Sequence, residues 1–275
     1  MALDAVCKNC GNSFTGGYCN NCGEKIYTEK DKNILHLLGE AFHFTTHFEG
    51  TFFNTLKAIT TRPGQLSADY CNGIRKKYFK PISFFFLLVI LYLLFPVFEG
   101  LNQSLYYYTH NGLYGDYAMQ KAIDVMRTKN LSDAEMTLAF QQKGEKVSKF
   151  LLFIIIPAIA LISWLSGFKK RKLYFDHFIF AIEEISFLIL WGFLLLPLLS
   201  GLLKLFGLNL FTSDYVIGAC ILVGFITHLF LAAKMFFNFK WYNNLFFTLT
   251  YTVCLGLVIQ YLYKLILFVL TINQI

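Results

Sequence analysis

Five long apolar stretches constrain this chain more than any other feature of its sequence. They cover residues 81–98, 150–168, 178–203, 215–236 and 244–270, and formal charges are few in each of them. A helix needs about 20 apolar residues to cross a hydrocarbon core of about 30 Å. With 56% hydrophobic and only 15% charged residues, the chain is too apolar to cover the surface of a soluble domain with polar groups. We therefore predict an all-α polytopic membrane protein with about five transmembrane helices.

Lysine and arginine lie unequally on the two sides of these predicted spans. When the spans are followed in order, 16 of these cations fall on the side of the N-terminus and 8 on the other side. Positive residues are enriched in cytoplasmic loops. We expect a membrane protein with a cytoplasmic N-terminus, an external loop at 99–149 and an external C-terminus. No apolar segment precedes the first cysteines, so no cleavable signal peptide is expected.

Four cysteines near the N-terminus form two C-x2-C pairs, separated by eight residues. They are Cys7, Cys10, Cys19 and Cys22. Two residues between paired cysteines allow both thiolates of a tight turn to face one ion, and the glycine after each pair tolerates the positive φ of such a turn. We predict a zinc ribbon over residues 1–28 that holds one structural Zn²⁺, with iron in a rubredoxin-like site as the alternative. Thiolates need a reducing compartment, which agrees with a cytosolic N-terminus.

The formal charges of this ribbon cancel, because Lys8 and Lys25 are balanced by Asp4 and Glu24. A ribbon that binds nucleic acid usually carries a basic face. We therefore expect a protein partner at the ribbon and no nucleic acid. The net charge of +7 for the whole chain reflects topology and attraction to anionic lipid headgroups.

Residues 29–80 are predicted to form cytosolic or interfacial amphipathic helices. In residues 33–48 one helical face gathers four polar side chains opposite a broad apolar face, and these are His36, Glu40, His43 and His47. This face is interpreted as a solvated surface, with a metal site as the alternative. Further on, Thr51 is predicted to cap a helix that Pro63-Gly64 ends. A second short helix over residues 66–71 is predicted to stop at Asn72-Gly73.

Cations gather where this segment enters the first span. They are Arg62, Arg75, Lys76, Lys77 and Lys80. Basic and aromatic side chains suit the headgroup layer, so we expect these residues to contact the lipid bilayer, with a specific lipid-phosphate pocket as the alternative. In the external loop, Ser132 and Glu135 have the spacing of a capping box that begins a helix running into the second span.

Ionisable residues at membrane depth are costly and mark candidate functional sites. The candidates here are Asp176, His177, Glu183, Glu184 and His228. The helical rise of about 1.5 Å per residue puts the glutamates and His228 at similar depth in antiparallel neighbours. We therefore predict that Glu183 or Glu184 lies within reach of His228.

Four segments carry a family resemblance when taken together. They read CKNCGNSFTGGYCNNCGEK (7–25), TLKAITTRPGQL (55–66), YCNGIRKKYFKPISFFFLL (70–88) and, more weakly, FDHFIFAIEEISF (175–187). This combination resembles the bacterial membrane proteins of domain-of-unknown-function family 3667, typical of Bacteroidetes. The resemblance implies a zinc-ribbon inner-membrane protein without an assigned activity, so it supplies no catalytic residues.

Motifs of common enzymes, such as H-E-x-x-H, G-x-S-x-G and Walker A, do not occur in the sequence. Our favoured hypothesis is a non-enzymatic membrane scaffold or assembly/regulatory factor that uses its ribbon for protein contacts. One alternative is a small transporter or accessory permease with a polar site at His228, Glu183 and Glu184. Another is a lipid-processing enzyme built on Asp176, His177 and the two glutamates.

Overall fold

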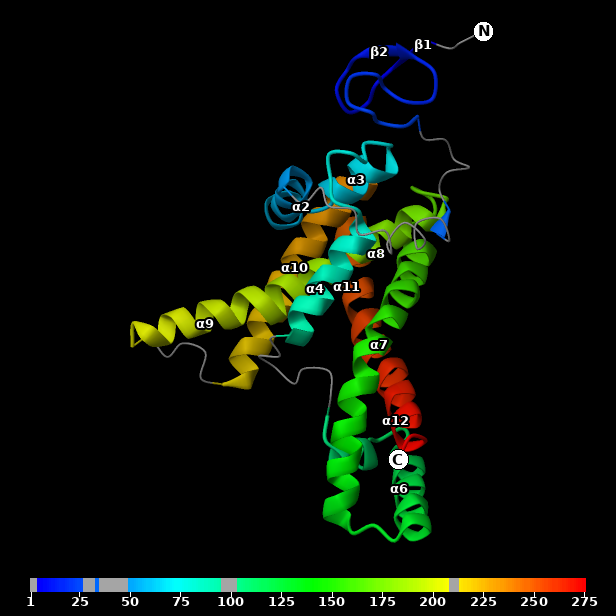
Figure 1. The fold of residues 1–275 in the computed structure, drawn as a ribbon, viewed down its shortest axis with the longest axis vertical. Helices are drawn as coiled ribbons and strands as arrows, with labels where there is room; N and C mark the ends of the chain where they lie inside the picture. The colour runs from blue at the N-terminus through cyan, green and yellow to red at the C-terminus, as the bar shows by residue number, and fades with distance from the viewer. Residues whose placement is uncertain (1–3, 27–32, 35–48, 95–102, 208–212) are drawn as a thin grey trace. The chain divides into compact units, whose positions relative to one another are not determined.

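The computed structural model describes residues 4–26, 33–34, 49–94, 103–207 and 213–275 (Figure 1). Most of these residues are helical. The chain divides into two compact units: unit 1 consists of Met1–Phe95 and Ala160–Thr252, and unit 2 of Pro96–Ile159 and Val253–Ile275. The predicted polar face of residues 33–48, with His36, Glu40, His43 and His47, lies outside the described residues.

Unit 1 begins with a small ribbon. Its strands β1 (Asp4–Val6) and β2 (Ser13–Thr15) pair antiparallel, with Ala5 opposite Phe14. Phe14 packs with Cys7 and Cys19 in a small core. This core contains few apolar side chains, and modules of this size commonly gain stability from a bound metal.

Two helices follow in unit 1, α2 (Glu49–Thr61) and α3 (Gln65–Cys71). The expected cap at Thr51 is wrong, because α2 already begins at Glu49 and the Thr51 carbonyl accepts a hydrogen bond from the Phe79 N–H at 3.2 Å. The Pro63-Gly64 turn ends α2 as predicted, and Gly64 has a positive φ of 80°.

Helix α3 is more deeply buried than an interfacial helix would be. Its buried residues run from Leu66 to Cys71, and it packs against α8 and α10. The apolar side chains of Leu66, Ala68 and Tyr70 explain this placement, since burying them removes apolar surface from solvent. Part of the segment that the sequence assigns to the interface is therefore packed against the membrane helices.

Three helices among the described residues are long and apolar enough to cross a membrane. The first, Tyr174–Leu205, joins α8 (Tyr174–Leu188), η2 (Ile189–Leu195) and α9 (Leu196–Leu205). The second, Tyr215–Phe237, lies within α10 (Asp214–Phe237). The third, Trp241–Ile272, joins α11 (Trp241–Leu257), η3 (Val258–Tyr263) and α12 (Lys264–Ile272). Shorter apolar helical stretches are Pro81–Tyr92 in α4 (Pro81–Leu94) and Ile154–Gly167 in α7 (Asp133–Gly167).

The helix predicted to begin near residue 178 begins at Tyr174, so that Asp176 and His177 belong to its buried first turn. Two of the spanning helices also contain π-helical segments, η2 and η3. The second of these ends directly before Lys264.

Unit 2 is built from α5 (Leu105–Thr109), α6 (Gly115–Lys129), α12 and the N-terminal part of α7. The predicted capping box is confirmed: Glu135 Oε2 accepts hydrogen bonds from the Ser132 N–H at 2.9 Å and from the Ser132 hydroxyl at 2.7 Å. Helix α7 then runs unbroken for 35 residues.

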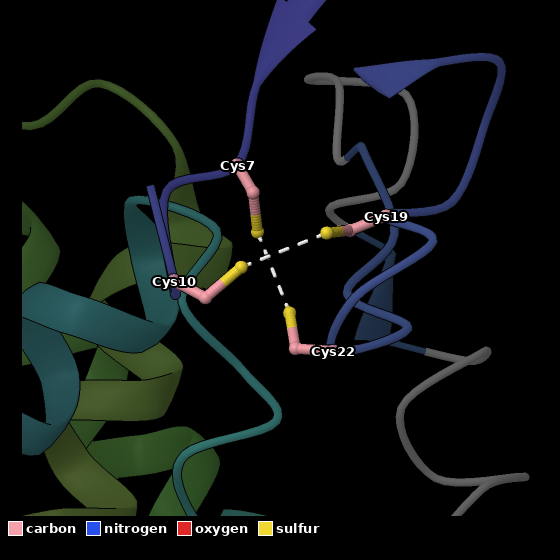
Figure 2. Close-up of side chains that lie close together, drawn as sticks. All are labelled: Cys7, Cys10, Cys19 and Cys22. Carbon is pink, nitrogen blue, oxygen red and sulfur yellow. Dashed lines mark hydrogen bonds between the residues drawn. The ribbon is translucent and has the colours of Figure 1, made fainter. Parts of the chain in front are cut away.

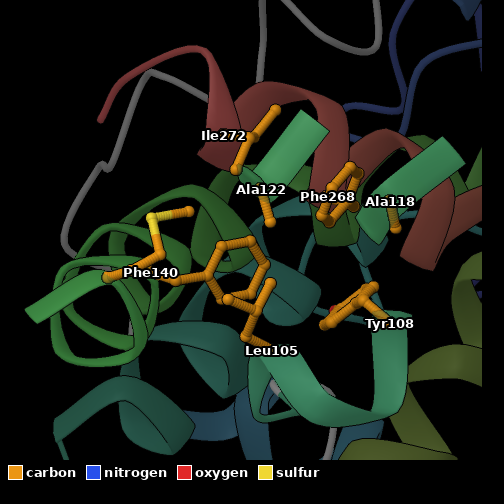
Figure 3. Packing of buried hydrophobic residues seen from close by; sticks show 8 residues of the cluster. Leu105, Tyr108, Ala118, Ala122, Phe140, Phe268 and Ile272 are labelled. Carbon is orange, nitrogen blue, oxygen red and sulfur yellow. The ribbon is translucent and has the colours of Figure 1, made fainter. Parts of the chain in front are cut away.

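A hydrophobic core holds unit 2 together (Figure 3). Ala118 and Ala122 lie one turn apart on α6, and their small side chains leave room for the ring of Phe268 from α12. Phe140 of α7 contacts the same ring, with 5.8 Å between centroids. The core is completed by Leu105, Tyr108, Met136 and Ile272.

Candidate metal centre and buried polar cluster

The four cysteines of the ribbon point toward one centre (Figure 2). Cys7 and Cys10 come from the turn after β1, and Cys19 and Cys22 from the turn after β2. Both turns have the same backbone: the N–H of Gly11 donates to the Cys7 carbonyl, and that of Gly23 to the Cys19 carbonyl, each at 2.8 Å. The positive φ predicted for these glycines is present, 76° at Gly11 and 68° at Gly23.

The cysteine geometry fits a tetrahedral metal ion. The sulfur–sulfur distances are 3.5 Å for Cys7 and Cys22 and 3.6 Å for Cys10 and Cys19, and all four sulfurs lie within 4.8 Å of one another. Four metal–sulfur bonds of about 2.3 Å would separate the sulfurs by about 3.8 Å. Backbone N–H groups also favour thiolates, because the N–H of Cys22 lowers the pKa of Cys19 to about 6. These residues could therefore hold a metal ion.

The residue after the second turn, Glu24, connects the ribbon to the basic segment before α4. Its side chain is 3% exposed, and Oε2 accepts hydrogen bonds from the backbone N–H groups of Arg75 at 3.0 Å and Lys76 at 2.8 Å. On the ribbon's first turn, Lys8 Nζ donates to the Asn72 carbonyl at 3.0 Å. Both cysteine-containing turns of the ribbon thus contact residues 72–76.

Arg75 and Lys77, two of the predicted headgroup cations, contact aromatic and acidic groups of the chain itself. The Arg75 guanidinium lies over the rings of Tyr70 and Phe175, at 4.7 and 5.5 Å from their centroids. Lys77 Nζ lies 2.9 Å from Asp69 Oδ2. The side chains of Arg62 and Lys76 are exposed, and that of Lys80 is partly exposed.

Asp69 also accepts a hydrogen bond from the Tyr78 hydroxyl at 2.6 Å. Burial, together with this bond to Asp69, raises the pKa of Tyr78 to about 12. The hydrogen bonds to Tyr78 and Asp69 in turn raise the pKa of Lys77. These contacts fix the orientation of the segment between α3 and α4.

Glu183 on α8 binds the turn between α2 and α3. It is 0% exposed; Oε1 accepts from the Gly64 N–H at 2.8 Å, and Oε2 accepts from the Ser67 N–H at 2.8 Å and from the Ser67 hydroxyl. A backbone N–H can only donate, so both oxygens of Glu183 act as acceptors, as they do in an ionised carboxylate.

Glu184, the next residue, contacts a different helix. Its Oε2 lies 3.1 Å from His228 Nδ1 on α10, so the predicted contact between this glutamate pair and His228 is confirmed for Glu184. The other ring nitrogen, Nε2, lies 2.8 Å from the Ile59 carbonyl of α2. Phe187 stacks on the imidazole with 3.7 Å between centroids. The sequence gives no sign of the contacts to Ile59, Gly64 and Ser67.

Asp176 and His177 have a separate set of partners. His177 Nδ1 lies 2.9 Å from Ser163 Oγ and Nε2 lies 2.9 Å from the Arg171 carbonyl, while Asp176 pairs with Arg171 Nη1 at 3.3 Å. Ser163 and His177 are both 0% exposed. These groups therefore hold the loop between α7 and α8.

A row of buried polar residues on α11 was not predicted from the sequence. Asn244, Thr248 and Tyr251 lie on one helical face and are at most 1% exposed. Asn244 Nδ2 donates to the Phe230 carbonyl at 2.8 Å, and the Tyr251 ring packs edge-on against Phe180, one turn before Glu184. Their i, i+4, i+7 spacing within an apolar helix is the signal that could have identified them.

A family model described as "Protein of unknown function (DUF3667)" matches residues 49–93. The match supports the family that the sequence resembles, and it covers α2, α3, the basic segment and most of α4. It therefore includes Ile59, Gly64 and Ser67, the groups of the α2–α3 segment that contact His228 and Glu183. No curated protein and no solved structure matches this chain.

Proposed function

We propose that this protein is a non-enzymatic integral-membrane scaffold or regulatory factor that contacts a protein partner through its ribbon. The observation that carries the proposal is that polar side chains at membrane depth bind the α2–α3 segment. Both oxygens of Glu183 and the Nε2 atom of His228 are engaged by groups of residues 59–67, and the Nδ1 atom of His228 contacts Glu184 of α8. In a transporter we would expect such groups to face a cavity open to substrate.

The ribbon has the surface that a contact module needs. Three of its apolar side chains are exposed, Val6 by 67%, Tyr18 by 65% and Ile26 by 40%. Aromatic and aliphatic side chains of this kind supply much of the binding energy at protein interfaces. Glu24 and Lys8 meanwhile hold the ribbon against residues 72–76, so a partner bound to the ribbon would lie close to the membrane entry.

The finer features of the proposal rest on the sequence. The metal is one Zn²⁺, because four thiolates at these distances suit its tetrahedral preference. The membrane is the bacterial inner membrane, with five spans and a cytosolic N-terminus. The lipid-processing alternative is not carried further, because Ser163 and His177 are buried and both nitrogens of His177 have partners.

The test is photo-crosslinking in native membranes, with a photoreactive residue in place of Tyr18. We expect a defined protein adduct that disappears in the Cys19→Ser background, because that ribbon loses its metal and unfolds. A Cys254→Ser background, which alters a cysteine outside the ribbon, should keep the adduct. Failure of Tyr18 to crosslink any protein, while metal analysis finds one zinc per chain, would reject the scaffold proposal. Iron in place of zinc would reject the assignment of the ion.

A further inference from the structure

The hydrogen-bond partners of His228 restrict where protons can lie in the buried cluster. The Ile59 carbonyl is an acceptor only, so His228 Nε2 must carry a proton. One further proton lies between Nδ1 and Glu184 Oε2, whichever atom holds it. With that single shared proton, the Glu184–His228 pair has no net charge.

Glu183 then leaves an uncompensated charge. Its two backbone N–H donors and the Ser67 hydroxyl favour an ionised carboxylate, and no Lys or Arg in the described part of the chain forms an ion pair with either glutamate. The cluster would therefore hold one net negative charge at membrane depth, where an unpaired charge is costly. A second bound proton would remove that charge.

The structure also provides the position for the second proton. Glu184 Oε1 is buried and has no hydrogen-bond partner among the described residues, although Oε2 of the same carboxyl group is engaged by His228. The buried hydroxyl of Tyr251 on α11 also lacks a partner there. Its ring packs edge-on against Phe180, which lies one helical turn before Glu184 on α8.

We propose that Glu184 Oε1 is a proton-binding site, so that the folded protein at neutral pH holds ionised Glu183, protonated Glu184 and the imidazolium form of His228. Among the described residues, the other elements packed against α8 add no competing charge at this point: α2 and α3 contribute the Ile59 carbonyl and the backbone N–H groups, α4 has no charged residue, and Asp69 of α3 is engaged by Lys77 and Tyr78. This inference does not depend on the proposed role of the ribbon.

Infrared spectroscopy of the purified full chain, with ¹³C in its glutamate carboxyl groups, tests the proposal. At about pH 7, where an ordinary glutamate is ionised, we expect one glutamate band of a protonated carboxyl group. Glu184→Gln should remove the band, and Tyr251→Phe should shift it. Glu145→Gln, which alters an exposed carboxylate of α7, should leave it unchanged.

Glu183→Gln tests whether Glu184 is protonated because of the charge on Glu183 or only because it is buried. This variant removes the negative charge but keeps Glu184, so the band should disappear. A band that survives in Glu183→Gln or in Glu184→Gln would overturn the proposal, as would the absence of the band in the wild-type protein. The nitrogen NMR shifts of His228 in wild-type protein give a readout that needs no variant: a neutral imidazole at about pH 7 would also overturn it.

Discussion

Glu183 and Glu184 are neighbours in the sequence, but the structure gives them different tasks. Glu183 holds the turn between α2 and α3, whereas Glu184 orients the imidazole of His228. Successive residues of a helix point about 100° apart, so the pair reaches two neighbouring elements at once. The stability of the α2–α3 segment therefore depends on Glu183 far more than it would depend on an exposed acidic residue.

Glu183→Gln should lower the free energy of unfolding by about 2–4 kcal/mol. The amide nitrogen of glutamine would face a hydrogen-bond donor that binds a carboxylate oxygen in the wild-type protein. Ser67→Ala removes only the hydroxyl contact and should cost about 1 kcal/mol. Chemical unfolding in detergent, followed by tryptophan fluorescence, measures both. Equal losses for the two variants would show that the backbone contacts of Glu183 contribute little.

Glu135 should make the start of α7 sensitive to pH. Hydrogen bonds from the Ser132 N–H and hydroxyl lower the pKa of Glu135, so the stabilisation is present above the ordinary carboxyl pKa and is lost as the pH falls through the lowered value. Amide exchange at Ser132, relative to its intrinsic rate, should lose protection in that acid range. Glu135→Gln should remove this pH dependence, and Glu145→Gln should preserve it.

At the scale of elements, Gly64 allows α3 to pack against α10. A Cβ at this position would lie 2.5 Å from the Ala232 carbonyl oxygen, and the φ of 80° disfavours any other residue. Gly64→Ala should lower the free energy of unfolding by about 3 kcal/mol or more. Gly50→Ala is the matched control, since a Cβ there meets nothing within 4 Å and α2 should gain slightly. Similar stability of the two variants would contradict the observed packing.

Elements differ in how well the sequence predicts them. The charge-free runs predict the apolar helices, and Ser132 and Glu135 predict the start of α7, because hydropathy and capping act locally. The depth of His228 predicts its contact with Glu184, because helical rise is regular. The burial of α3 could not be predicted, since the backbone N–H groups that bind Glu183 occur in every residue but proline. The prediction of a cap at Thr51 was wrong for a related reason. Residues that can cap a helix are common, and α2 begins before Thr51.

At the scale of the whole molecule, Glu24 links the state of the ribbon to residues 72–76. Glu24→Ala should keep the four cysteines and the metal but free the amides of Arg75 and Lys76, whose hydrogen exchange should accelerate about tenfold or more. Removing the metal with a chelator should have the same effect. Asn20→Ala, an exposed change within the ribbon, is the control. Unchanged protection in Glu24→Ala would exclude this contact as the link.

The predicted topology can be tested with reporter fusions. We expect fusions at Lys170 and Asn238 to report the cytoplasm, and fusions at Gln120 and Ile275 to report the outside. This result requires the shorter apolar stretches in α4 and α7 to cross the membrane together with the three long helices. A cytoplasmic signal at Ile275 would contradict the expected number of spans.

The reliance of residues 59–76 on main-chain contacts has a consequence for evolution. Glu183, His228 and Glu24 bind backbone groups of Ile59, Gly64, Ser67, Arg75 and Lys76, and the Ser67 hydroxyl is the exception. A side chain that binds a peptide group does not require a matching substitution on the other side. Covariation between α8 and this segment should therefore be weak in homologous sequences, apart from position 67, so the acidic residues can persist while most of their partner positions drift.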